Sequence, residues 1–195
     1  MKKKSVKKSA QQFRTNADEV VAFAESAEAA LGKKHLSWAF DYAVIRLYRD
    51  FESLVFDALV GAINNDASTI STRTGYAFPK HMNQSVCGYM IVGDGYFDFK
   101  GRSGLIETIK KYVPDSHYLL VAVKKADYTD ALDRLSGLRN YAAHDSLKSK
   151  NAALKATGKH RMSSAGSWLK KHGRLKSLAE KLKDLATEIE DGAPY

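Results

Sequence analysis

The chain has 195 residues, of which 44% are hydrophobic and 10% aromatic, and its formal net charge is +9. This composition suffices for one globular domain with a sizeable core and excludes a disordered chain. The positive charge favours a polyanionic partner, and the single cysteine, Cys87, excludes an intramolecular disulfide and a cysteine-based metal site. No apolar run approaches the eighteen or so residues of a membrane span, and one lone cysteine fits a reducing cytoplasm.

The chain begins with a basic segment that holds five lysines and no acid before Ser9. No apolar run follows it, so it is not a signal peptide. We expect residues 1–12 to form a flexible basic tail and residues 13–195 a single domain. The first predicted helix runs from Ala17 to Leu31, with Gly32 placed to end it.

The second predicted helix begins near His35 or Ser37 and ends at about Asn64. One apolar seam recurs at alternating steps of four and three residues, which suits antiparallel helix packing. A second apolar face indicates a helix that is central to the core or to a dimer interface. The seam consists of Phe40, Val44, Leu47, Phe51, Leu54 and Ala58, and the second face of Trp38, Tyr42, Ile45, Tyr48, Val55 and Leu59.

Helical periodicity is lost between Asn64 and Lys100, where threonine, glycine, serine and asparagine become frequent. The stretch from Tyr89 to Phe99 reads as two short strands around a Gly-Asp-Gly turn. The sequence therefore predicts a mainly all-α fold. It is an antiparallel helical bundle with a small β-hairpin-containing insert, at about 66–101, between the second and third helices. His81 and Cys87 alone are too few ligands for a metal, so we expect none.

Three further helices are predicted after the insert. The first spans Ser103 to Val113 and is stopped by Pro114, whereas periodicity leaves the short apolar run 118–123 open between strand and buried helix. The second starts at Thr129 as N-cap and carries a leucine stripe. The last begins near Ser164 or Ser167, ends at Glu190 and should close the bundle.

The helix that starts at Thr129 carries Arg139, Asn140 and His144 in its later turns. Histidine titrates near neutral pH and transfers protons, and the arginine fork of donors matches a phosphate. At about 100° per residue, Asn140 and His144 share a helix face, while Arg139 points about 140° away from His144. One helix alone therefore aims the Arg139 and His144 pair poorly.

The run Arg139-Asn140-x-x-x-His144 at the end of a helix resembles the signature of the HEPN superfamily, and most of all its RiboL-PSP-type branch. The resemblance extends from Phe13 to about Leu185 and also includes the long aromatic-rich helix and the insert. It implies an all-helical, metal-independent endoribonuclease without a cofactor, which acts as a toxin or effector in a prokaryotic defence or toxin-antitoxin system. Arg139 and His144 correspond to the catalytic pair, and Asn140 to the polar residue that follows the arginine.

The resemblance further implies a homodimer in which two motifs face one cleft, because a single histidine cannot serve as acid and base at once. It also implies RNA as substrate and an antitoxin or defence-system protein as a possible partner. After the motif, cations dominate: only Asp145 is acidic between His144 and Glu180. Lys148 and Lys150, next to the motif, are the predicted RNA-binding residues.

Two alternatives stay open from the sequence. One is a catalytically inactive HEPN-like domain that binds RNA, a nucleotide or a protein. The other is a helical DNA- or RNA-binding adaptor in which Arg139 and His144 are incidental. RNA cleavage in the presence of a chelator separates the active enzyme from the first alternative. For the second, Arg139→Lys should have little effect on activity.

Overall fold

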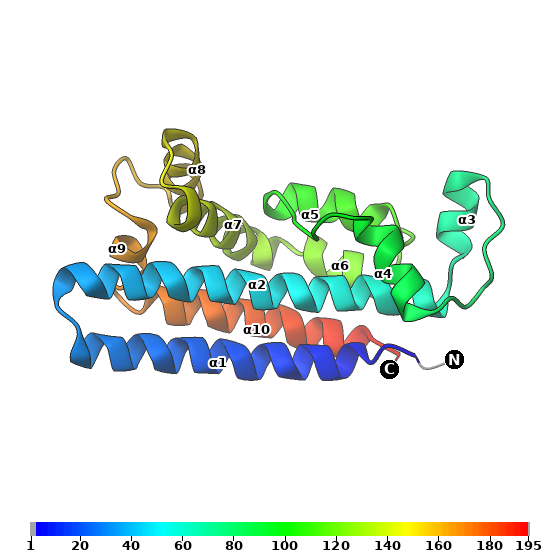
Figure 1. Cartoon of the computed structure of the whole chain (residues 1–195), viewed down its shortest axis with the longest axis horizontal. Helices are drawn as coiled ribbons and strands as arrows, with labels where there is room; N and C mark the ends of the chain where they lie inside the picture. Colours follow the sequence, from blue (N-terminus) through cyan, green and yellow to red (C-terminus); the bar gives the residue numbers. More distant parts are fainter. Residues whose placement is uncertain (1–2, 195) are drawn as a thin grey trace.

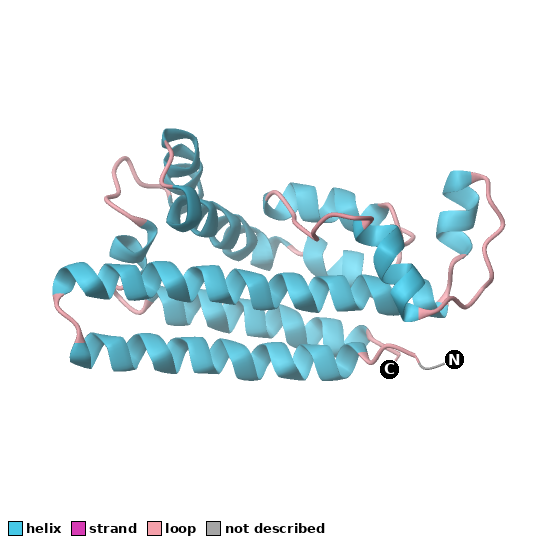
Figure 2. Cartoon of the chain, in the orientation of Figure 1, coloured by secondary structure: helices cyan, strands magenta, loops and turns pink. Residues whose placement is uncertain are grey.

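A computed structural model describes residues 3–194 of the chain. Within this range every regular element is a helix, and no strand is present (Figure 1, Figure 2). The predicted all-α fold class is therefore confirmed. The helices are α1 (Val6–Ala30), α2 (Lys33–Asn65), α3 (Ser68–Thr74), α4 (Gln84–Val92), α5 (Gly101–Lys110), α6 (Tyr118–Lys124), the short 3-10 helix η1 (Ala126–Tyr128), α7 (Thr129–His144), α8 (Leu147–Thr157), α9 (Ala165–Leu169) and α10 (Arg174–Gly192).

The three longest helices, α1, α2 and α10, lie lengthwise side by side (Figure 1). A tight connection at Leu31 and Gly32 joins α1 to α2, so the two helices run antiparallel. Helix α1 packs on both α2 and α10, and α7 and α9 pack on α2. Both ends of the chain lie at the same end of this layer, while α7 packs on α2 and α8 packs on α7 (Figure 1).

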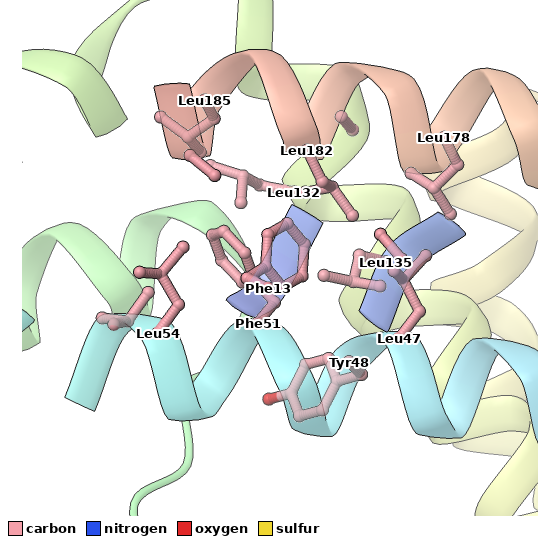
Figure 3. Packing of buried hydrophobic residues seen from close by; sticks show 14 of the residues in the cluster. Phe13, Leu47, Tyr48, Phe51, Leu54, Leu132, Leu135, Leu178, Leu182 and Leu185 are labelled. Atoms are coloured by element: carbon pink, nitrogen blue, oxygen red, sulfur yellow. The ribbon is translucent and has the colours of Figure 1, made fainter. Parts of the chain in front are cut away.

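The core lies where α1, α2, α7 and α10 meet (Figure 3). At its centre Phe13 and Phe51 pack edge to face, with ring centroids 5.6 Å apart. Leu132 and Leu135 of α7 and Leu182 of α10 surround the two rings (Figure 3). The predicted seam of α2 is confirmed, because all six of its residues are buried.

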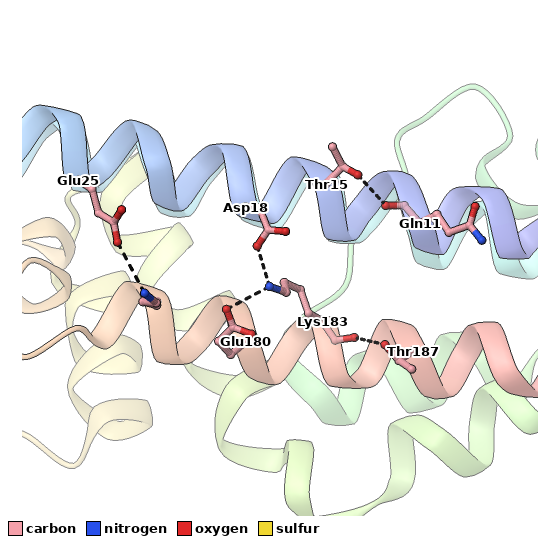
Figure 4. A network of polar contacts seen from close by, with 8 residues as sticks. Gln11, Thr15, Asp18, Glu25, Glu180, Lys183 and Thr187 are labelled. Carbon is pink, nitrogen blue, oxygen red and sulfur yellow. Dashed lines mark hydrogen bonds and ion pairs between the residues drawn. The ribbon is translucent and has the colours of Figure 1, made fainter.

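Polar contacts join the outer faces of α1 and α10 (Figure 4). The Lys183 ammonium lies 2.6 Å from Asp18 of α1 and 3.0 Å from Glu180 of its own helix. Lys176 approaches Glu25 at 3.9 Å. Exposed ion pairs of this kind contribute little to the free energy of unfolding. We therefore expect them to influence how α10 is aligned along α1 rather than how tightly the two helices pack.

The predicted β-hairpin is wrong. Residues Gln84–Val92 form α4, which Asn83 caps by accepting the N–H of Ser85 at 2.7 Å. Gly93, with φ of +56°, ends the helix. Cys87 and Ile91 are four residues apart, which puts them on one helix face, and they pack with Ile63 at the end of α2. This packing, which the sequence could not display, favours helix over strand, so the insert at 66–101 holds α3, α4 and loops.

The structure also differs from the expected tail at 1–12. Helix α1 begins at Val6, where Ser5 caps it by accepting the N–H of Lys8, and Val6 and Ala10 are buried. These two residues continue the apolar stripe of Phe13 at steps of four and three. Met1 and Lys2 lie outside the described residues.

The region after residue 117 is more helical than expected. The open run at 118–123 lies in helix α6, and α7 starts at Thr129 with Tyr128, not Thr129, in the N-cap position. The polar stretch that follows the motif forms α8, capped by a reciprocal pair of hydrogen bonds between Ser146 and Ser149. The expected last helix is divided into α9 and α10.

Candidate active site

Helix α7 places the Arg139 motif at the surface because its other face is anchored in the core. Leu135, Leu138 and Tyr141 are buried, and the Tyr141 hydroxyl donates to the carbonyl of Ser163 at 2.9 Å. Helix α8 crosses α7 closely at Gly137, where an added Cβ would lie 3.3 Å from the carbonyl oxygen of Ala152. The close crossing fixes the direction in which α8 leaves the motif.

Arg139 is held by two neighbours. Its Nη1 donates to Asn140 Oδ1 at 2.7 Å, and its guanidinium carbon lies 4.5 Å from the centroid of the Tyr48 ring. The ring is itself fixed, because Tyr48 is 1% exposed and its hydroxyl lies 2.8 Å from Asp98 Oδ1 and 2.9 Å from the Phe99 carbonyl oxygen. Arg139 has no carboxylate within 4.0 Å among residues 3–194. The fixed guanidinium therefore keeps donors for an outside anion.

Glu52 stands one helical turn beyond Tyr48 and was not predicted from the sequence. Its Oε1 is buried and has no hydrogen-bond partner in the described part of the chain. Burial raises the pKa of Glu52 to about 7, the Arg139 charge opposes this rise, and the nearby Asp98 carboxylate adds to it. No sequence signal distinguished Glu52, because α2 also carries the carboxylates of Asp41, Asp50 and Asp57.

Two surface hollows meet at Arg139. The larger, which we call the motif groove, has a volume of about 810 Å³ and lies between α5, α7 and α8. The smaller, of about 630 Å³, is lined by Tyr48 and Glu52 among others. Arg139 and Asp98 line both hollows. Arg139 therefore faces the groove and the buried carboxyl group at the same time.

The structure brings Arg139, Asn140 and His144 together along the motif groove. Arg139 and Asn140 are half-buried, whereas His144 is exposed as the last residue of α7. Asp145 ends that helix in the left-handed region, with φ of +41°. Lys148 lines the groove, but Lys150, although also on α8, does not. Of the two predicted RNA contacts, only Lys148 is therefore placed beside the motif.

The groove carries two further cations: Lys155, which belongs to the basic run after the motif, and Lys100, which the sequence did not single out. Three carboxylates also line the groove, those of Asp98, Asp130 and Asp133. Asp130 is ion-paired with Arg134 at 2.7 Å, and Asp133 accepts the backbone N–H of Arg102 at 3.0 Å. Only Asp130 is neutralised by an ion pair, so a polyanion in the groove would contact the lysines rather than the side on which Asp98 and Asp133 lie.

The described residues contain no cluster of three or more histidine, cysteine or carboxylate side chains able to hold a metal ion. No helix among them has the length and apolar character needed to cross a membrane. Comparisons with protein-family models, curated proteins and solved structures give no match to this chain.

Proposed function

We propose that the chain is a metal-independent endoribonuclease of the HEPN type. The observation that carries the proposal is the shared groove: Arg139, Asn140 and His144 line one hollow with three lysines around it. RNA cleavage by this route requires removal of the 2′-hydroxyl proton, protonation of the departing 5′-oxygen and stabilisation of the phosphorane. The groove offers a residue for proton transfer and a cation for the phosphate.

Each motif residue then has a role. Arg139, restrained by Tyr48 and Asn140, binds the scissile phosphate and stabilises charge that builds on its oxygens. His144 transfers the proton, for which its exposed position gives access to substrate. Asn140 orients the guanidinium through the 2.7 Å hydrogen bond. The expected products are a 2′,3′-cyclic phosphate and a 5′-hydroxyl.

A homodimer would supply the second proton-transfer group. The N-terminal third of α2 exposes Trp38 at 58% and Tyr42 at 56%, an apolar surface of the kind that marks protein contacts. It lies near the end of α7, because Asp41 of α2 accepts the N–H of Gly166 at 2.6 Å and Tyr141 of α7 donates to the carbonyl of Ser163 at 2.9 Å. A second copy on this surface would bring two His144 side chains near each other.

A catalytically inactive HEPN-like RNA-binding module is the second candidate. The observation that favours it concerns His144, whose side chain has no hydrogen-bond partner among residues 3–194. Catalytic histidines are usually oriented by such a partner. In an active dimer, the second copy would supply the hydrogen-bond partner that orients His144. In the inactive module, His144 would stay without one.

The test compares RNA cleavage by the parent chain and by His144→Ala, with His160→Ala as the matched control on an exposed histidine outside the groove. We expect cleavage to be abolished only in the first variant. At equal total protein concentration and with free exchange of subunits, an equal mixture of parent and His144→Ala should keep about a quarter of the activity if both histidines of a dimer are needed. It should keep about three quarters if one histidine per dimer suffices, and about half if each subunit acts alone. Unchanged cleavage by His144→Ala would contradict the proposal.

The biological setting belongs to the same proposal. We place the enzyme in the cytoplasm of a prokaryote, as a toxin or effector of a defence or toxin-antitoxin system. A neutralising antitoxin or another defence protein would be its protein partner.

A further inference from the structure

A second basic site surrounds Trp168 and shares no lining residue with the motif groove. Helix α9 carries Trp168 and is held tightly on α2: the Gly166 N–H donates to Asp41 Oδ1 at 2.6 Å, and an added Cβ at Gly166 would lie 1.9 Å from the Ser37 carbonyl oxygen. Ser164 and Ser167 cap the helix reciprocally. The position of Trp168 is therefore determined by the packing of α9 on α2 as well as by its own contacts.

The turn into α10 brings Arg174 onto Trp168. His172 and Gly173 adopt left-handed backbone conformations, with φ of +56° and +63°. The Arg174 guanidinium carbon then lies 4.5 Å from the centroid of the Trp168 ring, and its Nη1 donates to the Trp168 carbonyl oxygen at 3.0 Å. This arrangement combines a planar cation with an aromatic ring, both of which bind nucleotides in other proteins.

A hollow of about 400 Å³, which we call the Trp168 cleft, is lined by Arg161, Lys171 and Arg174 and by no carboxylate. None of these three cations has an ion pair within 4.0 Å in the described part of the chain. By contrast, Lys176 and Lys183 on α10 both have acidic partners. Three clustered cations without counter-charges repel one another, so the cleft is complementary to an anion with several charges.

The polar edge of the Trp168 indole is not exposed to the cleft. Its Nε1 is buried and has no partner among residues 3–194. Trp168 and Arg174 also line an adjoining hollow of about 600 Å³ on the side of α7. That hollow contains Asp127 and Asp130, so we assign the anion to the cleft itself.

The adjoining hollow leads back to the motif. Asp130, whose charge is neutralised by Arg134, lines both this hollow and the motif groove. Lys155, near the end of α8, lines the groove. Lys159, two residues after α8 ends at Thr157, lines the adjoining hollow. A single strand that leaves the groove along α8 thus meets cations on its way to the cleft.

We propose that the Trp168 cleft binds backbone phosphates of the RNA strand outside the cleaved linkage, with a base or ribose against the Trp168 and Arg174 pair. This inference rests on the proposed function. It adds a binding site that takes no part in the chemistry, so its loss weakens substrate binding and leaves the catalytic step intact.

The experiment uses the full chain with His144→Ala, so that RNA is bound but not cut. Fluorescence is recorded with and without Trp168→Phe, because the chain has two tryptophans and the difference reports on Trp168 while Trp38 stays in place. A short oligouridylate is titrated while Trp168 fluorescence is followed. We expect a saturable change in fluorescence. Replacing Arg161 and Lys171 together by alanine should weaken binding by about tenfold or more and lower the salt slope by about two.

The matched control replaces Arg73 and Lys111, two exposed cations elsewhere on the surface, and should bind like the parent. Unchanged Trp168 fluorescence, or equal weakening by both double variants, would overturn the inference. Inorganic phosphate is titrated separately, and saturation at the same concentration as RNA would also overturn it, since the cleft would then hold a small free anion. If Trp168 responds to RNA but the parent never cleaves it, the proposed function falls and the cleft remains.

Discussion

The motif groove and the Trp168 cleft are both basic, but they hold their cations differently. In the groove, Arg139 is restrained by a buried tyrosine ring and an amide, with an unpartnered carboxyl oxygen of Glu52 nearby. In the cleft, Arg161 and Lys171 are exposed and have no acidic partner among the described residues. A cation fixed in advance suits stabilisation of a transition state, whereas exposed cations suit adjustable contact with a polyanion.

The largest expected effect comes from changing the fixed cation. Arg139→Lys keeps the charge but loses the planar fork that contacts Asn140 and lies over Tyr48. We expect kcat for RNA cleavage to fall by about 10²–10³-fold. Arg73→Lys, on exposed α3, is the matched control and should leave kcat unchanged. If the Arg139→Lys variant kept the parental kcat, the restrained guanidinium of Arg139 would have no special role in the groove compared with the exposed cations of the cleft.

The next largest effect concerns α9, the helix that carries Trp168. Gly166→Ala would place a Cβ against the backbone of Ser37 and so push α9 off α2. We expect a loss of about 1–3 kcal/mol in the free energy of unfolding, measured by urea denaturation. Gly32→Ala is the control, because its φ is −65° and no atom lies within 4 Å of the added Cβ. Equal stability of the two variants would show that α9 is not seated as described.

A smaller effect separates binding from chemistry. Lys171→Ala removes one exposed cation of the cleft and touches no residue of the motif groove. We expect KM for RNA to rise several-fold with kcat unchanged, the reverse of the Arg139→Lys result. Steady-state cleavage at low and high salt measures both constants. A fall in kcat would instead connect the cleft to the catalytic step.

The smallest expected effect is a change in how stability varies with pH. Burial raises the pKa of Glu52 from 4.5 to about 7, in a pocket that Tyr48, Asp98 and Arg139 also face. The folded chain therefore holds a proton that the unfolded chain has lost, and the free energy of unfolding should fall as pH rises through this window. Because Glu52 is partly exposed, solvent reduces the size of the fall.

Glu52→Gln cannot ionise, so its free energy of unfolding should not show that fall between pH 4.5 and 7. His117 acts in the opposite sense, since burial lowers its pKa to about 4 and stability is lost as pH falls below 6.5. Both proteins contain His117, so the difference between their urea midpoints isolates Glu52. Glu107→Gln, on an exposed carboxylate, should keep the parental slope. A Glu52→Gln slope equal to the parent's would show that Glu52 does not titrate in this window.

The sequence was sufficient where one helix face is apolar and the other polar. The seam of α2 and the leucines of α7 and α10 lie in the core, as expected, because the period of the apolar residues identifies the buried side of each helix. The sequence did not predict α4, because its apolar residues pack against the end of α2, in particular against Ile63, and this contact is not visible in the local pattern. The same limit applies to α9 and α10, which Gly173 separates.

At the candidate site the sequence identified the motif but not its surroundings. Arg139, Asn140 and His144 are close in the chain, so their type and spacing were readable. Tyr48 and Glu52 reach Arg139 through the packing of α2 against α7, and Asp98, from the segment before α5, is held there by the Tyr48 hydroxyl. Trp168 and Arg161 likewise meet through the turns around α9, which no local pattern specifies.

The most direct test of the central claim is the chemistry of RNA cleavage itself. The parent chain is incubated with a defined RNA in excess chelator, and the ends of the products are analysed. We predict continued cleavage with 2′,3′-cyclic phosphate and 5′-hydroxyl ends, which His144→Ala does not produce. Cleavage that stops on chelation, or products that carry 5′-phosphate ends, would contradict the assignment of Arg139 and His144 as a metal-independent site.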